Sequence, residues 1–144
     1  MEGQVLPQDF ITYLAGTQES AYTDLFTFAV DTLTFANKIH IYHWSCESGF
    51  HHTHLQTIYE TLREFADTLV EIALLDGKFK INSKNYLIND EVFNIENCIR
   101  KLQFFVDELG KLSEQFKSKI AISNLMDETI QKINQELGLL KNFK

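Results

Sequence analysis

The sequence predicts an all-α protein, a four-helix bundle with one long crossover between its second and third helices. Three observations lead to this class. The 144-residue chain has a single proline and six glycines, it contains long stretches without helix breakers, and its apolar residues recur at three- and four-residue spacing. A chain of this length buries one sizeable core, so we expect a single domain over residues 1–144.

The first half of the chain predicts two long helices. One is expected from about Ala21 to Trp44, because two neighbouring apolar stripes run along it, and Ser45–Gly49 then interrupts the pattern. The next is expected from about Phe50 to Leu75, with Gly77 as its stop. The two stripes of the first helix contain Tyr22, Phe26, Ala29, Leu33, Ala36, His40 and His43, and Leu25, Phe28, Thr32, Phe35, Ile39 and Tyr42.

The second half predicts two more helices after a polar connection. The segment Lys78–Asn89 is longer than a tight turn, which favours a crossover along the bundle over a hairpin. Helices are then expected from about Asp90 to Lys117 and from about Ser123 to Leu140. Their expected core residues are Ile95, Ile99, Leu102, Val106, Leu109 and Phe116, followed by Met126, Ile130, Ile133, Leu137 and Leu140.

The charge of the chain is −7 and is unevenly distributed. Residues 1–76 hold eleven acids against Lys38 and Arg63, whereas residues 77–144 hold nine acids against eleven bases. This balance suits a protein that attracts cations and disfavours a general nucleic-acid binder. No apolar run is long enough to span a membrane, and Cys46 and Cys98 lack metal-type spacing, so we expect reduced thiols in the cytoplasm.

The candidate metal ligands lie in the acidic half. All five histidines fall between His40 and His54, and Asp67 and Glu71 lie one turn apart on the second helix. Of the three histidines near the start of that helix, only His52 lies on the side of the carboxylates, about 60° from Asp67 around the axis. Imidazole and carboxylate together are typical ligands of iron and zinc.

Distance along the helix rules out a site within one chain. His52 and Asp67 are 15 positions apart, which is about 22 Å along the helix axis, and ligands of one ion lie within roughly 2.0–2.2 Å of it. The residues meet only if two copies of this helix run antiparallel across a two-fold axis. For each pair of residues that face each other across this axis, the two residue numbers then add to about 119 to 123. The axis therefore lies near Tyr59, Glu60, Leu62 and Arg63. Each site groups His43 and His52 of one chain with Asp67 and Glu71 of the other.

The motif resembles the signature of the Dps-type miniferritins, which have a ferritin-like fold and assemble as dodecamers. His43-Trp44, a loop containing Gly49, His52, and Asp67-x-x-x-Glu71 match in order, and the interval from His52 to Asp67 matches in length. The resemblance implies a ferroxidase that stores iron and protects against oxidative stress, with Fe²⁺/Fe³⁺ at His43, His52, Asp67 and Glu71 and zinc as a substitute ion. The short interval between His43 and His52 is similar to that of ferritin-like proteins encoded by bacteriophages, which implies the cytoplasm of a bacterial host.

The chain also departs from the family. Many members carry an acid four residues after the second-helix histidine, where this chain has Gln56, so a second iron position would have to be built differently, with Glu60 as one candidate. The first ten residues contain no Lys or Arg. The basic tail with which some members hold DNA is therefore absent, and DNA binding is not expected.

Other interpretations compete for the same residues. Asp67 and Glu71 fit an ordinary solvated face, with Arg63 pairing Asp67 at i,i+4. His40 fits a core or interface position, and His51 and His54 fit surface or loop positions. Trp44 fits either a buried anchor or a sink for oxidising equivalents, and Cys46 either a reactive or an inert thiol. The alternative function is a ferritin-like assembly protein with a vestigial or zinc-filled site. A di-iron site within one chain is disfavoured, because the sequence has no Glu-x-x-His and no histidine after His54.

Overall fold

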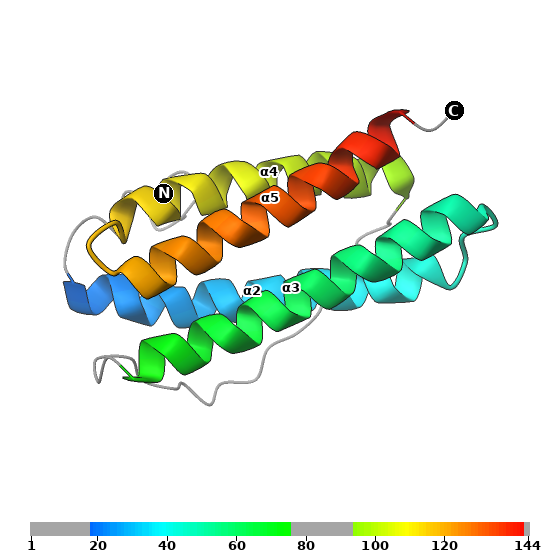
Figure 1. The fold of residues 1–144 in the computed structure, drawn as a ribbon. Helices are drawn as coiled ribbons and strands as arrows, with labels where there is room; N and C mark the ends of the chain where they lie inside the picture. Colours follow the sequence, from blue (N-terminus) through cyan, green and yellow to red (C-terminus); the bar gives the residue numbers. More distant parts are fainter. Residues whose placement is uncertain (1–17, 76–93, 143–144) are drawn as a thin grey trace, which may run out of the picture.

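The described part of the protein consists of four long α-helices arranged as two antiparallel pairs (Figure 1). The computed structural model describes residues 18–75 and 94–142. In chain order the helices are α2 (Gln18–His43), α3 (Gly49–Leu75), α4 (Ile95–Gln115) and α5 (Ile120–Asn142). No strand occurs among these residues, so the predicted all-α four-helix bundle is confirmed.

The connection between the pairs joins opposite ends of the bundle. Helix α3 ends beside the start of α5, whereas α4 begins at the far end of the molecule (Figure 1). The predicted stop at Gly77, the crossover segment and the expected first turn of the third helix lie outside the described residues. The positions of the two helix ends agree with a long connection rather than a hairpin.

Local sequence sets two of the helix starts. The Ser48 side chain accepts a hydrogen bond from the backbone N–H of His51 at 3.2 Å, and the Asn94 side chain accepts one from Asn97 at 2.8 Å. Both bonds satisfy backbone donors that have no partner inside the first turn of a helix. The first of these caps starts α3 at Gly49, which places both His51 and His54 in the helix rather than in a loop.

The core is continuous through all four helices, and aromatic contacts join three of them. Phe28 of α2 stacks on Phe105 of α4 with ring centroids 5.7 Å apart. Phe65 of α3 meets both rings edge-on, at 6.3 Å and 6.2 Å. The predicted core positions on α4 and α5 are buried or partly buried, as expected.

One positional prediction was wrong. Leu33 was placed on an inward stripe of the first helix, but 40% of its surface is exposed, because it lies at the edge of the apolar sector. The two-fold axis near Tyr59 to Leu62 stays a prediction; within the single chain Leu62 is fully buried and Tyr59 is 6% exposed. Of the four residues named for the axis, Glu60 is exposed and Arg63 is half-buried.

Among the described residues, no helix is long and apolar enough to cross a membrane.

Candidate metal centre

His43 and His52 meet at the end of the bundle where α2 turns into α3. Their rings stack with centroids 4.2 Å apart and planes 25° apart. The tight loop after α2 produces this contact, with Ser45 and Cys46 donating backbone hydrogen bonds to Tyr42 and His43 at 2.9 Å and 3.3 Å. His43 is 4% exposed, whereas His52 lies at the surface.

Hydrogen bonds fix the orientation of both imidazoles. Nδ1 of His43 lies 2.7 Å from the backbone oxygen of His40, and Nδ1 of His52 lies 3.0 Å from the backbone oxygen of His43. A carbonyl oxygen only accepts, so each Nδ1 carries the proton and donates it. In the neutral imidazole this leaves the Nε2 lone pair of each ring for a metal ion, which is the usual outer-shell arrangement of histidine ligands.

His40 and His54 are engaged in other contacts. Nδ1 of His40 accepts a hydrogen bond from the Arg63 guanidinium at 3.0 Å, so its proton resides on Nε2. Burial and then the charge of Arg63 lower the pKa of His40, which agrees with its role as a neutral acceptor. Nδ1 of His54 lies 2.7 Å from the carboxylate of Glu136 on α5, and the His54 side chain is 23% exposed.

Tyr59 joins the histidines into one aromatic cluster. Its ring stacks on His40 at 4.0 Å and meets His43 edge-on at 5.1 Å. Trp44, of which 68% is exposed, lies 5.3 Å from His40. Trp44 is therefore not the buried anchor of one alternative interpretation, and its indole stays accessible beside the cluster.

Asp67 and Glu71 lie on the exposed face of α3. Neither carboxylate forms a hydrogen bond or ion pair with another described residue. The expected alternative, a pair between Arg63 and Asp67, does not form, because Nη2 of Arg63 donates to Asn37 at 2.6 Å and to His40 at 3.0 Å. The two carboxylates are therefore left available to a cation.

One chain does not complete a metal site. Within residues 18–75 and 94–142, no three histidine, cysteine or acidic side chains gather closely enough to hold an ion. The structure brings His43 and His52 together but leaves Asp67 and Glu71 on the same helix more than four turns away. A complete set of four ligands would therefore need donors from a second molecule.

The two cysteines do not extend the site. Burial raises the pKa of the Cys98 thiol to about 12. Burial also raises the pKa of Cys46, an effect that the side-chain contact with Tyr42 partly offsets. A thiol with a raised pKa is a poor nucleophile and a poor metal ligand at neutral pH, which favours the inert interpretation of Cys46.

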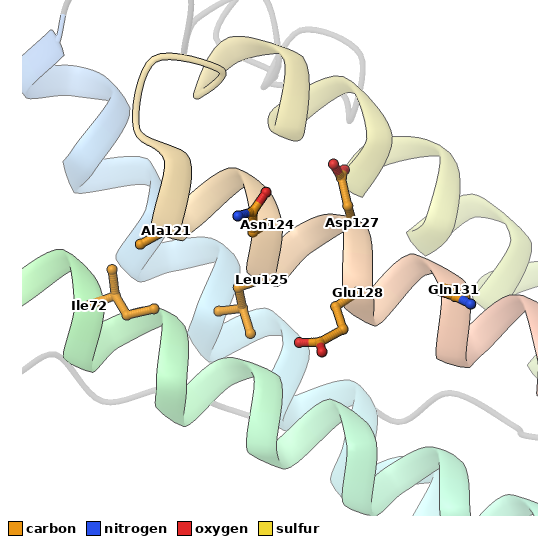
Figure 2. A pocket seen from close by; sticks show the side chains of 7 residues that line it. All are labelled: Ile72, Ala121, Asn124, Leu125, Asp127, Glu128 and Gln131. Atoms are coloured by element: carbon orange, nitrogen blue, oxygen red, sulfur yellow. The ribbon is translucent and has the colours of Figure 1, made fainter.

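A separate groove lies between α3 and α5 at the opposite end of the bundle (Figure 2). Its volume is about 500 Å³, and Figure 2 shows Ile72 of α3 facing Ala121 and Leu125 of α5. The Glu128 side chain points toward α3, whereas the Asp127 side chain points toward α4. Asp127 accepts a hydrogen bond from Ser113 at 2.6 Å. No histidine or cysteine lines this groove, so it offers a different set of groups from the candidate metal centre.

No family model matches the chain, and the searches of curated proteins and of solved structures likewise return no match.

Sequence reasoning missed the residues that orient the ligands. The spacing in the sequence predicted His43, His52, Asp67 and Glu71 as a set. It gave no signal that Tyr59 contacts His40 and His43, or that Asn37 accepts a hydrogen bond from Arg63. The backbone oxygens that fix each Nδ1 proton also have no side-chain signature. The i,i+4 spacing of Arg63 and Asp67 was misleading, because the stronger contacts of Arg63 cross to α2.

Proposed function

We propose that the protein is a ferroxidase of the miniferritin type, which oxidises Fe(II) at sites shared by two chains and sequesters the product in a protein shell. The proposal rests on the hydrogen bonding of the four candidate ligands. Two stacked histidines each have Nδ1 bound to a backbone oxygen, and two carboxylates on the same helix have no partner among the described residues.

The chemistry of these groups suits iron as the substrate. Neutral imidazole nitrogen binds Fe(II), and carboxylate oxygen, a harder donor, stabilises the Fe(III) product. The oxidant is hydrogen peroxide or dioxygen: two Fe(II) ions supply the two electrons that, with two protons, reduce one peroxide to two waters, and four Fe(II) ions supply the four electrons that, with four protons, reduce one dioxygen to two waters. The negative charge of the first half of the chain raises the local concentration of the cation.

The assembly follows from the separation of the ligands. In an antiparallel pair of α3 helices, His52 of one chain faces Asp67 and Glu71 of its mate, and the two-fold axis repeats the site on the other side. With Leu62 and Tyr59 buried in each bundle, Glu60 and Arg63 are the residues that would meet near the axis. The exposed apolar residues Leu33 and Ile41 of α2, and Trp44 directly after it, provide further surface for contact between chains. By resemblance, the dimers build a closed shell of twelve.

The assembly alternative keeps this dimer but not the oxidation. In that case the site binds zinc or holds no metal, and the exposed apolar residues of α2 form contacts between chains. Aerobic addition of Fe(II) separates the two functions. A ferroxidase produces ferric absorbance faster than buffer alone and carries iron through size exclusion in a multi-chain species.

Three variants sharpen this test. His52→Ala and Asp67→Asn each remove one donor, so both should bring the oxidation rate close to the rate in buffer. His54→Ala is the matched control, because His54 lies on the same helix but pairs with Glu136. Oxidation that is equally fast in His52→Ala and in the unsubstituted protein would contradict the proposal.

A further inference from the structure

Arg63 is held on the side of α3 that faces α2. Its Nη2 atom donates to Oδ1 of Asn37 at 2.6 Å and to Nδ1 of His40 at 3.0 Å. The guanidinium carbon lies 5.1 Å from the centre of the Tyr59 ring, within range of a cation–π interaction. Two residues of α2 and one of α3 therefore fix the position of a single positive charge.

The position matters because Asp67 follows Arg63 by four residues on the same helix. Side chains at this spacing are neighbours, and a guanidinium beside a carboxylate ordinarily forms a forked ion pair. In residues 1–76 the only other base is Lys38. Arg63 is thus the nearest positive charge along α3 that could neutralise Asp67. Its contacts with Asn37 and His40 direct the guanidinium toward α2 and away from Asp67.

We propose that Asn37 and His40 are positioning residues that hold Arg63 away from Asp67 and so keep this carboxylate open to a divalent cation. The inference rests on the proposed metal site and adds to it a determinant of cation affinity. Without the contacts to Asn37 and His40, the guanidinium of Arg63 pairs with Asp67. A divalent cation must then displace the guanidinium before it binds the carboxylate. An exposed pair of this kind is worth at most about 1 kcal/mol, so the loss of affinity is about two- to fivefold.

The experiment measures zinc binding to the full-length assembled protein by calorimetry. Asn37→Leu with His40→Phe removes both acceptors, while the phenyl ring retains stacking on Tyr59. We expect a two- to fivefold weaker zinc affinity, and adding Arg63→Gln to the pair should restore it. Asn134→Leu on α5 serves as the control for loss of an exposed asparagine, and it should leave the affinity unchanged.

The rescue distinguishes positioning from general damage. A variant that binds zinc weakly because its helices are misplaced gains nothing from Arg63→Gln, so a loss without rescue overturns the proposal. Unchanged affinity in the Asn37→Leu, His40→Phe protein also overturns it. If that pair of substitutions fails to fold, Asn37→Leu alone, with and without Arg63→Gln, gives the same comparison.

A crystal structure of the metal-free variant provides a reading that does not depend on zinc. The guanidinium of Arg63 should then lie within hydrogen-bond distance of Asp67, and a guanidinium still lying against Tyr59 would overturn the inference. If the unsubstituted protein binds no zinc, the proposed metal site fails, whereas movement of Arg63 toward Asp67 in the variant would still support its positioning by α2.

Discussion

Glu108 should destabilise the folded protein at neutral pH, and replacing it should therefore raise stability. The residue is 5% exposed, and Oε1 is a buried atom for which the structure shows no hydrogen-bond partner. The nearest cation, Nζ of Lys111, lies 3.7 Å from Oε2, and the lysine side chain is 54% exposed. Burial raises the pKa of Glu108, and the charge of Lys111 only partly offsets this.

The magnitude follows from two opposing terms. A buried acceptor without a partner costs about 1–3 kcal/mol, and an ion pair with a solvated lysine returns roughly 0–1 kcal/mol. Glu108→Leu should therefore increase the free energy of unfolding by about 1–2 kcal/mol at pH 8. Glu108→Gln keeps the shape, removes the charge and replaces one acceptor oxygen with an NH2 group.

The sign of the pH dependence follows from the raised pKa. Protonated Glu108 is favoured in the folded state, so its contribution to stability is fully present below the ordinary value of 4.5 and is lost as pH rises through the higher folded value. The advantage of Glu108→Gln should thus be absent near pH 4 and grow toward pH 8. Urea unfolding at fixed protein concentration measures it.

Asp107→Asn is the matched control, because Asp107 is the exposed neighbour of Glu108. Its effect should stay within about 0.5 kcal/mol, as for ordinary surface positions. Glu108→Gln that destabilises the protein at pH 8, or a gain that is equal at pH 4 and pH 8, would refute this account of the buried carboxyl.

The remaining predictions concern the histidines, the thiols and the charge of the surface. His54→Ala should lower the free energy of unfolding by about 1 kcal/mol, because it leaves the half-buried Glu136 without its partner. Calorimetry should show unchanged zinc binding. A loss of zinc affinity as large as that of His52→Ala would show that His54 is a ligand. A thiol reagent should label the half-buried Cys46 before the fully buried Cys98, and the reverse order would contradict the burial described above. The protein should not shift duplex DNA at physiological salt, since its first ten residues lack Lys and Arg, and a clear shift in a gel would show that another basic surface exists.

The four helices could be predicted from the sequence because their apolar spacing repeats over many turns. The burial of residues at the edge of an apolar sector could not be predicted. The position of a residue such as Leu33 around the helix does not show whether a neighbouring helix covers it. The partner of His54 was also beyond reach, because Glu136 lies 82 residues later and meets it only through the packing of α3 on α5.

The candidate site was predictable to the extent that it lies on one helix. The spacing of His52, Asp67 and Glu71 fixed their angles and separation, and with them the need for a second chain. Which nitrogen of each imidazole is available depends on the loop that brings the backbone oxygen of His43 to His52. The direction of Arg63 depends on Asn37, 26 residues earlier, and neither contact leaves a pattern in the sequence.

The shared site is tested most directly by mixing two inactive variants, His52→Ala and Asp67→Ala. After unfolding and refolding together in equal amounts, half of the dimers should be mixed, and each mixed dimer should contain one site built only from unsubstituted residues. About a quarter of the unsubstituted protein's Fe(II) oxidation should therefore return. Mixing His52→Ala with His43→Ala should restore none, because both changes affect the histidine side of the site. Recovery only in the first mixture is the predicted result, and verified mixed dimers of His52→Ala and Asp67→Ala that oxidise no iron would contradict the shared site.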